Sequence, residues 1–166
     1  MKERPVRKRI RLKGYDYSST GAYFVTICVK DKHELLGEVV VGCDALGAPL
    51  MQLSKYGALI HKEIEDIHLY YENVRVDHFV VMPNHVHMIV AIYEYNGAPR
   101  ASRPTTALIP NVIGILKRKT NRAYGFNMWQ KSFHDHIIRD DAEYHRICRY
   151  IDENPAKWTE DEYYAR

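Results

Sequence analysis

The 166-residue sequence has little cysteine and no long apolar run. Its cysteines, Cys28, Cys43 and Cys148, are widely separated and form no CxxC pair, which argues against a disulfide framework and against a zinc ribbon. The apolar runs are far too short to span a membrane, and residues 1–13 are basic rather than apolar, unlike a signal peptide. We therefore expect a cytoplasmic protein.

Basic residues occur in clusters, although the net charge is only +3. One cluster near the start of the chain consists of Lys2, Arg4, Arg7, Lys8, Arg9, Arg11 and Lys13. A second, within one predicted helix, consists of Lys117, Arg118, Lys119 and Arg122. Such clusters favour contact with a polyanion such as nucleic acid, although basic tails often serve only solubility. We predict a basic arm over residues 1–14 and one domain over residues 15–166, a length that suits a single core.

The pattern of apolar residues predicts an α+β domain. Runs rich in β-branched and aromatic residues predict strands at 23–29, 36–41, 74–82 and 85–92, and a short strand within 129–138. Helical spacing and capping residues predict helices from Ser54 to about Tyr70, over 109–124, and from Asp140 or Asp141 to Asn154-Pro155. Successive strands are joined by turns too short for parallel crossovers. We therefore expect an antiparallel sheet with helices packed on one face.

The triplet His85-Val86-His87 lies in one of the predicted strands. Side chains alternate between the two faces of a strand, so the two histidines point the same way and Val86 points to the other face. Two imidazoles on one side of a strand make half of a site for a divalent metal. The alternative is a pair of partly exposed histidines after a turn. His134 and His136 form a rival pair, which we rank lower.

Tyr150 and Asn154 are four residues apart in the last predicted helix and therefore share one helix face. A tyrosine hydroxyl and an amide oxygen would project together there. The alternative is that Tyr150 merely packs while Asn154 ends the helix before Pro155.

Together these features resemble a known family. Residues 80–89, VVMPNHVHMI, resemble the HUH motif of single-tyrosine transposases, in which U is a bulky apolar residue. Residues 129–138, followed by Tyr150-Ile151 and Asn154-Pro155, resemble the C-terminal pattern of REP-associated tyrosine transposases, which are domesticated relatives of insertion-sequence transposases. The strand at 23–27 and Gly37-Glu38-Val39 also fit. The resemblance covers roughly residues 15–158.

The resemblance implies a fold, a reaction and a set of roles. The fold would be ferredoxin-like, as in RNA-recognition domains, with a C-terminal helix that carries the tyrosine. His85 and His87 match the ligands of Mg²⁺ or Mn²⁺, Tyr150 matches the nucleophile, and Asn154 matches the third ligand. The substrate would be single-stranded DNA hairpins from REP-like palindromes, cleaved and rejoined through a 5′-phosphotyrosine at the nucleoid. Both basic clusters would then be candidate DNA contacts.

Other functions remain open at this stage. A regulator that binds nucleic acid without cutting it would keep the fold and the basic surfaces. Another HUH endonuclease, such as a replication initiator or relaxase, would carry different tyrosine or histidine patterns. A simple metal hydrolase would need a carboxylate base, for which Asp152 and Glu153 are candidates. We expect a monomer rather than a homodimer.

Overall fold

The computed structural model describes residue 16 and residues 18–40, 49–94 and 107–164. The predicted basic arm therefore lies outside the described residues, together with its candidate contacts Arg4, Arg7, Lys8, Arg9, Arg11 and Lys13. Residues 95–106 lie outside them as well.

Four antiparallel strands form the main sheet, in the order β4-β5-β1-β6. They are β1 (Gly21–Cys28), β4 (Val74–Val81), β5 (His85–Ile92) and β6 (His134–Ile138). β1 pairs with β5 on one side and with β6 on the other, so that Phe24 lies opposite both Ile89 and His136. β6 therefore forms one edge of the sheet.

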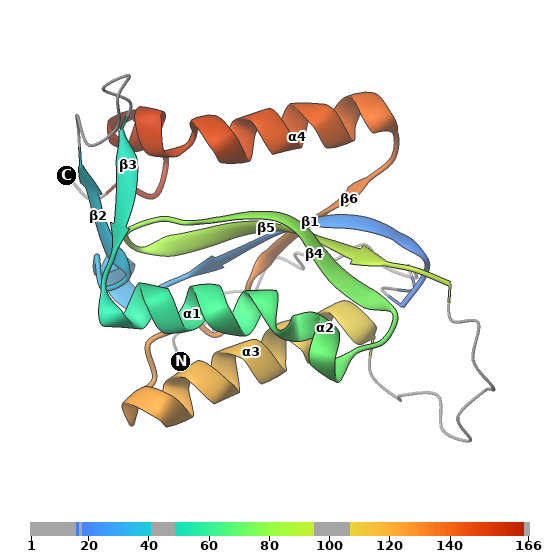
Figure 1. The fold of residues 1–166 in the computed structure, drawn as a ribbon, viewed down its shortest axis with the longest axis horizontal. Coiled ribbons are helices and arrows are strands. Elements are labelled where there is room, and N and C mark those ends of the chain that lie inside the picture. The colour runs from blue at the N-terminus through green and yellow to red at the C-terminus, as the bar shows by residue number, and fades with distance from the viewer. Residues whose placement is uncertain (1–15, 17, 41–48, 95–106, 165–166) are drawn as a thin grey trace, which may run out of the picture.

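Helices cover both faces of this sheet (Figure 1). α1 (Lys55–Glu65), α2 (Ile67–Tyr70) and α3 (Leu108–Tyr124) lie on one face, and α4 (Asp141–Glu153) lies across the other. The order β1-α1-β4-β5-α3-β6 is the β-α-β-β-α-β arrangement of ferredoxin-like folds. The structure thus confirms an α+β fold with a C-terminal helix that carries Tyr150. The helices expected on one face are α1, α2 and α3, and the C-terminal helix α4 packs on the opposite face.

The helices begin where capping side chains are available. Ser54 accepts hydrogen bonds from the backbone N–H groups of Tyr56 and Gly57, and Asp140 accepts one from Glu143. The single helix expected from Ser54 to Tyr70 is divided at Asp66 into α1 and α2.

A hairpin of β2 (Gly37–Val40) and β3 (Leu50–Leu53) forms a second, two-stranded sheet. β3 was not predicted from the sequence. Its four residues alternate between exposed and half-buried positions, which is too short a pattern to separate from a loop.

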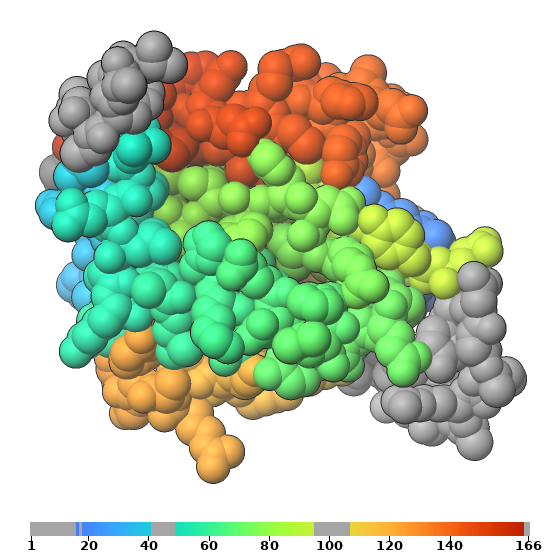
Figure 2. All heavy atoms as spheres, viewed as in Figure 1, coloured from blue at the N-terminus to red at the C-terminus, as the bar shows by residue number. Residues whose placement is uncertain are grey.

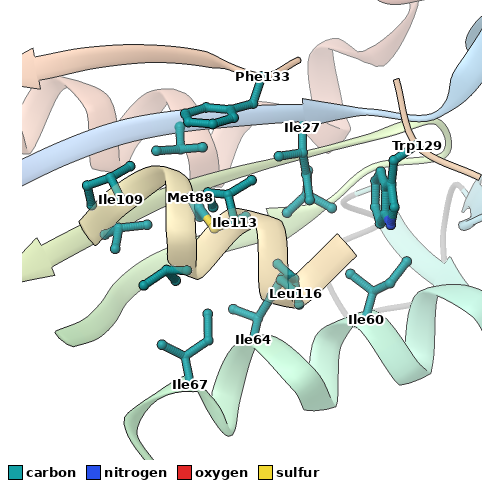
Figure 3. Packing of buried hydrophobic residues seen from close by; sticks show 14 of the residues in the cluster. Ile27, Ile60, Ile64, Ile67, Met88, Ile109, Ile113, Leu116, Trp129 and Phe133 are labelled. Carbon is teal, nitrogen blue, oxygen red and sulfur yellow. The ribbon is translucent and has the colours of Figure 1, made fainter. Parts of the chain in front are cut away.

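The main core lies between the sheet and the helices α1 and α3. Figure 3 shows how side chains of the sheet, such as Ile27 and Met88, meet Ile60 and Ile64 of α1. Ile109, Ile113 and Leu116 of α3 complete this core. Burial of these apolar side chains is the main force that holds the two helices to the sheet.

A smaller core lies on the other face, beneath α4. Ile147 and Ile151 of α4 pack against Ile89 of β5. In the space-filling view, α4 and the α1–α2 layer are separated by the residues of β4 and its neighbours (Figure 2). Among the residues that the structure describes, no helix is long and apolar enough to cross a membrane.

Candidate active site

The two histidines of the HxH triplet begin β5, and both are buried, with exposed fractions of 0% for His85 and 2% for His87. Strand alternation points them to the face covered by α4, while Val86 enters the main core on the other face. Their Nε2 atoms lie 3.0 Å apart. The predicted pairing of the two imidazoles is therefore present in the fold.

The Nδ1 atoms of both histidines are held by polar side chains. Asn84 Oδ1 lies 3.0 Å from His85 Nδ1, and Thr26 Oγ1 lies 2.8 Å from His87 Nδ1. An amide oxygen only accepts, so His85 donates from Nδ1 and keeps a lone pair on Nε2. A hydroxyl can accept as well as donate, so Thr26 permits the same tautomer at His87. Both Nε2 lone pairs can then face one cation.

Burial also fixes the charge of the pair. Loss of hydration lowers the pKa of His85 and of His87 to about 3, and for His87 the neighbouring His85 contributes as well. Both imidazoles are therefore neutral at physiological pH, which is the form that binds a metal ion.

Tyr150 of α4 reaches the histidines from above the sheet. Its hydroxyl lies 3.2 Å from His87 Nε2, and its side chain remains 42% exposed. Phe24 lies beside both rings, stacked on His87 at 5.3 Å between centroids and edge-on to Tyr150 at 6.0 Å. Burial and the Asp161 carboxylate raise the pKa of Tyr150, while the Asn154 amide opposes that rise. The phenol is therefore protonated at neutral pH.

A third potential metal ligand comes from Asp161, which the sequence analysis missed. Asp161 lies beyond α4 and η2 (Pro155–Glu160), and its Oδ2 atom is 4.0 Å from His85 Nε2. The ligand atoms of His85, His87 and Asp161 all lie within 4.8 Å of one another. No local pattern marks Asp161, because it reaches the site only through the turn after α4.

Asn154, the third ligand implied by the resemblance, is buried next to Asp161. Its Nδ2 donates to Asp161 Oδ2 at 3.2 Å. Its Oδ1 is buried and, within the described part of the chain, has no hydrogen-bond partner. A buried amide oxygen without a partner is costly unless a donor or cation completes it. Two neutral imidazoles, a carboxylate and an amide oxygen are thus a donor set that fits a divalent cation.

The residues after Asp161 also lie against the histidines. The Tyr163 ring is 4.5 Å from that of His85 and 5.9 Å from that of His87, measured between centroids. The segment is anchored through its backbone, because Asn84 Nδ2 donates to the Tyr163 carbonyl at 2.8 Å and Lys32 Nζ donates to that of Glu162 at 3.0 Å. No sequence pattern indicated these contacts.

The other predicted site residues do not belong to the candidate metal site. His136 Nε2 is 2.8 Å from Glu143 Oε1, and neither His134 nor His136 belongs to the one group of potential metal ligands found among the described residues. Asp152 is bonded to His78 at 2.8 Å, and Glu153 pairs with Lys157. The carboxylates that a simple hydrolase would use are therefore engaged elsewhere.

The basic cluster of α3 lies on the opposite face of the sheet from α4 (Figure 1). Lys117 Nζ donates to the carbonyls of Gln130 and Ser132 at 2.8 and 2.7 Å, and burial lowers its pKa to about 8. Lys119 bonds Glu63 and the hydroxyl of Tyr70. Arg118 and Arg122 are exposed. Two of the four predicted contacts, Lys117 and Lys119, are therefore already engaged within the fold, and their contact with DNA stays a prediction.

Comparison with known proteins identifies a sequence relative and a solved structure of similar fold. No protein-family model matches the sequence. An uncharacterized protein of Haemophilus influenzae is 33% identical, over 96% of this chain and 93% of that protein. The structure of a REP-associated tyrosine transposase bound to a REP hairpin matches with a TM-score of 0.61 and 21% identity, over 95% of this chain and 74% of that chain. This likeness confirms the expected resemblance at the level of the fold.

Proposed function

We propose that this chain, which belongs to the same family as the Haemophilus influenzae protein and has the fold of the REP-associated tyrosine transposase, is a metal-dependent tyrosine transposase that cuts and rejoins single-stranded DNA. The observation that carries the proposal is the 3.2 Å separation between the Tyr150 hydroxyl and His87 Nε2, at a group of residues that can hold a cation. A nucleophile beside a metal site is the arrangement that phosphoryl transfer requires.

His85 and His87 would hold Mg²⁺ or Mn²⁺ together with an oxygen of Asp161 or Asn154. When bound, the ion would polarise a non-bridging oxygen of the scissile phosphate. Asn84 and Thr26 orient the two imidazoles, and burial keeps them neutral. The chain thus prepares the ligands before substrate arrives.

Tyr150 would attack the phosphorus, forming an O–P bond while the bond from phosphorus to the 3′ oxygen breaks. The phenol proton is released to solvent, which reaches the 42%-exposed side chain, and the departing oxygen takes up a proton as a 3′ hydroxyl. Attack by a 3′ hydroxyl on the 5′-phosphotyrosine reverses these changes and rejoins a strand. Because no water is consumed, the bond energy is retained and no nucleotide cofactor is needed.

The DNA partner proposed is a single-stranded hairpin, and support comes from the matching transposase structure, which is bound to a REP hairpin. Of the candidate contacts in α3, Arg118 and Arg122 are the two with exposed side chains, and we assign backbone contacts away from the cut to them. The arm contacts from Arg4 to Lys13 stay a prediction.

The test is covalent capture of labelled single-stranded hairpins from the flanks of its own gene, with Mg²⁺ or Mn²⁺, on a denaturing gel. We expect a protein–DNA band with the wild type and none with Tyr150→Phe. Tyr93→Phe is the matched control, because Tyr93 is similarly exposed, at 49%, but lies at the far end of β5. Binding without an adduct in either metal would contradict the enzyme proposal and favour a non-catalytic regulator.

A further inference from the structure

Tyr150 is flanked by two hollows that differ in the number of carboxylates that line them. One is lined by Glu153, Glu160, Asp161, Glu162 and Lys157, so that carboxylates predominate. The other, of about 350 Å³, lies over β1 and β6 and is lined by Phe24, Thr26, His87, His134 and His136, with Asp135, Glu162 and Tyr163 at its walls. We call this second hollow the β6 groove. The acidic hollow carries four carboxylates against one lysine, whereas the β6 groove carries two carboxylates, so an anionic phosphodiester strand is repelled less in the β6 groove.

The strand register explains why the β6 groove begins at the histidine pair. His87 of β5 lies opposite Thr26 of β1, and Thr26 lies opposite His134 of β6. Residues opposite one another in antiparallel strands point to the same face. His87, Thr26 and His134 therefore form one row across three strands, about 10 Å long because two strand spacings separate its ends. The row runs from the candidate metal site to the edge of the sheet.

The next row along the strands supplies two lining residues of the groove, Phe24 and His136. It consists of Ile89, Phe24 and His136, in the same register. Phe24 is half-buried and lies against both His87 and Tyr150. Aromatic side chains against which bases can stack are a usual part of a site for unpaired nucleotides.

The two histidines of β6 differ in whether they have a hydrogen-bond partner. His136 is bonded to Glu143, whose carboxylate also accepts from the backbone N–H of Arg139. His134 is exposed and, within the residues described, makes no hydrogen bond or ion pair. Its imidazole N–H is free to donate to a phosphate oxygen in either protonation state.

We propose that the β6 groove binds the unpaired nucleotide next to the scissile phosphate, with His134 as the donor to its backbone phosphate and Phe24 as the wall beside it. This inference rests on the proposed function, since it names where the single strand lies in that same site. It also gives the second HxH pair a role in binding DNA rather than metal.

The test measures binding by fluorescence anisotropy, with every protein in the Tyr150→Phe background so that no cleavage intervenes. The probes are one DNA hairpin from the gene's flanks with single-stranded extensions on both sides and the same hairpin trimmed to a blunt end. His134→Ala should weaken binding of the extended hairpin about tenfold, the effect of losing one hydrogen bond to a charged group, and leave the blunt hairpin unchanged. His134→Gln, which keeps an N–H donor, should retain most of the affinity.

The matched control is His68→Ala, because His68 is an exposed histidine on α2, on the other side of the sheet. Equal affinity of wild type and His134→Ala for the extended hairpin, or equal losses for both DNAs, would overturn the inference. If His134→Ala weakens binding of the extended hairpin alone, but the protein with Tyr150 intact forms no covalent adduct with DNA, the groove binds DNA and the transposase proposal is wrong. If the adduct forms but His134→Ala does not weaken binding of the extended hairpin selectively, the transposase proposal stands and the assignment of the β6 groove is wrong.

Discussion

Asp161 and Asn154 compete for the role of third ligand, and the structure offers both within one buried contact of 3.2 Å. A carboxylate brings a full charge to the cation, whereas an amide brings only a dipole. We therefore expect Asp161→Asn to lower Mn²⁺ affinity, measured by calorimetry, at least about tenfold. Glu160→Gln, a change at the exposed neighbour, serves as the control. Wild-type affinity in Asp161→Asn, combined with a loss in Asn154→Ala, would assign the position to Asn154.

His85 and His87 should also make the metal-free protein sensitive to acid. Their pKa values fall from an ordinary 6.5 to about 3 on folding, so the unfolded chain binds more protons between those values. Stability is therefore present above about pH 6.5 and is lost as the pH falls below it. We expect each histidine to account for about 2 kcal/mol between about pH 8 and about pH 5.

Urea unfolding in the presence of a chelator measures this effect. His87→Gln removes one of the two groups, so its free energy of unfolding should fall less steeply with decreasing pH than that of the wild type. Parallel curves for the two proteins would show that the buried histidines are not the source of the dependence.

At the scale of elements, α1 packs closely against Leu36, the residue before β2, at the position of Gly57. A Cβ atom at this position would lie 2.0 Å from the Leu36 carbonyl oxygen, which is backbone and cannot move aside. Gly57→Ala should lower the free energy of unfolding by about 3 kcal/mol, as overpacking of a tight contact does.

Gly114→Ala is the matched control for that substitution. Gly114 lies inside α3, and its nearest neighbour would be the flexible end of Arg118 at 3.7 Å. Alanine there should stabilise the helix by about 0.5–1 kcal/mol. Equal stabilities of Gly57→Ala and the wild type in urea unfolding would contradict the packing that we describe.

Helices and strands could be predicted from the sequence wherever a local pattern, such as a capping residue or an alternation of side chains, indicated them. Ser54 and Asp140 begin helices as capping residues, and the alternation in His85-Val86-His87 separates site from core. The remainder of the site depends on contacts between distant residues, which periodicity does not encode. Thr26 meets His87 across 61 residues of sequence, and Asp161 arrives through an irregular turn.

At the scale of the molecule, the sheet places the main core on one face and the candidate active site on the other. α1 and α3 cover one face of the sheet and α4 lies across the other (Figure 1). The main core lies on the first face, and the histidine pair lies beside Tyr150 of α4 on the second. β1 and β5 serve both faces at once, because alternate side chains of each strand point in opposite directions. The sheet on which Tyr150 packs is therefore held in place largely by the main core on its opposite face.

Tyr150 is the proposed nucleophile, and a second tyrosine near the same histidines is the alternative that has to be excluded. Tyr163 also contacts both imidazole rings. Trypsin cleavage after Arg149 and Lys157 places Tyr150 in the peptide of residues 150–157 and Tyr163 in that of residues 158–166.

The most direct measurement is mass spectrometry of the protein–DNA adduct after digestion with nuclease and trypsin. Our account predicts a nucleotide attached through a 5′ phosphate to the peptide of residues 150–157, at Tyr150. A nucleotide on the peptide of residues 158–166, or no modified peptide in either metal, would contradict it.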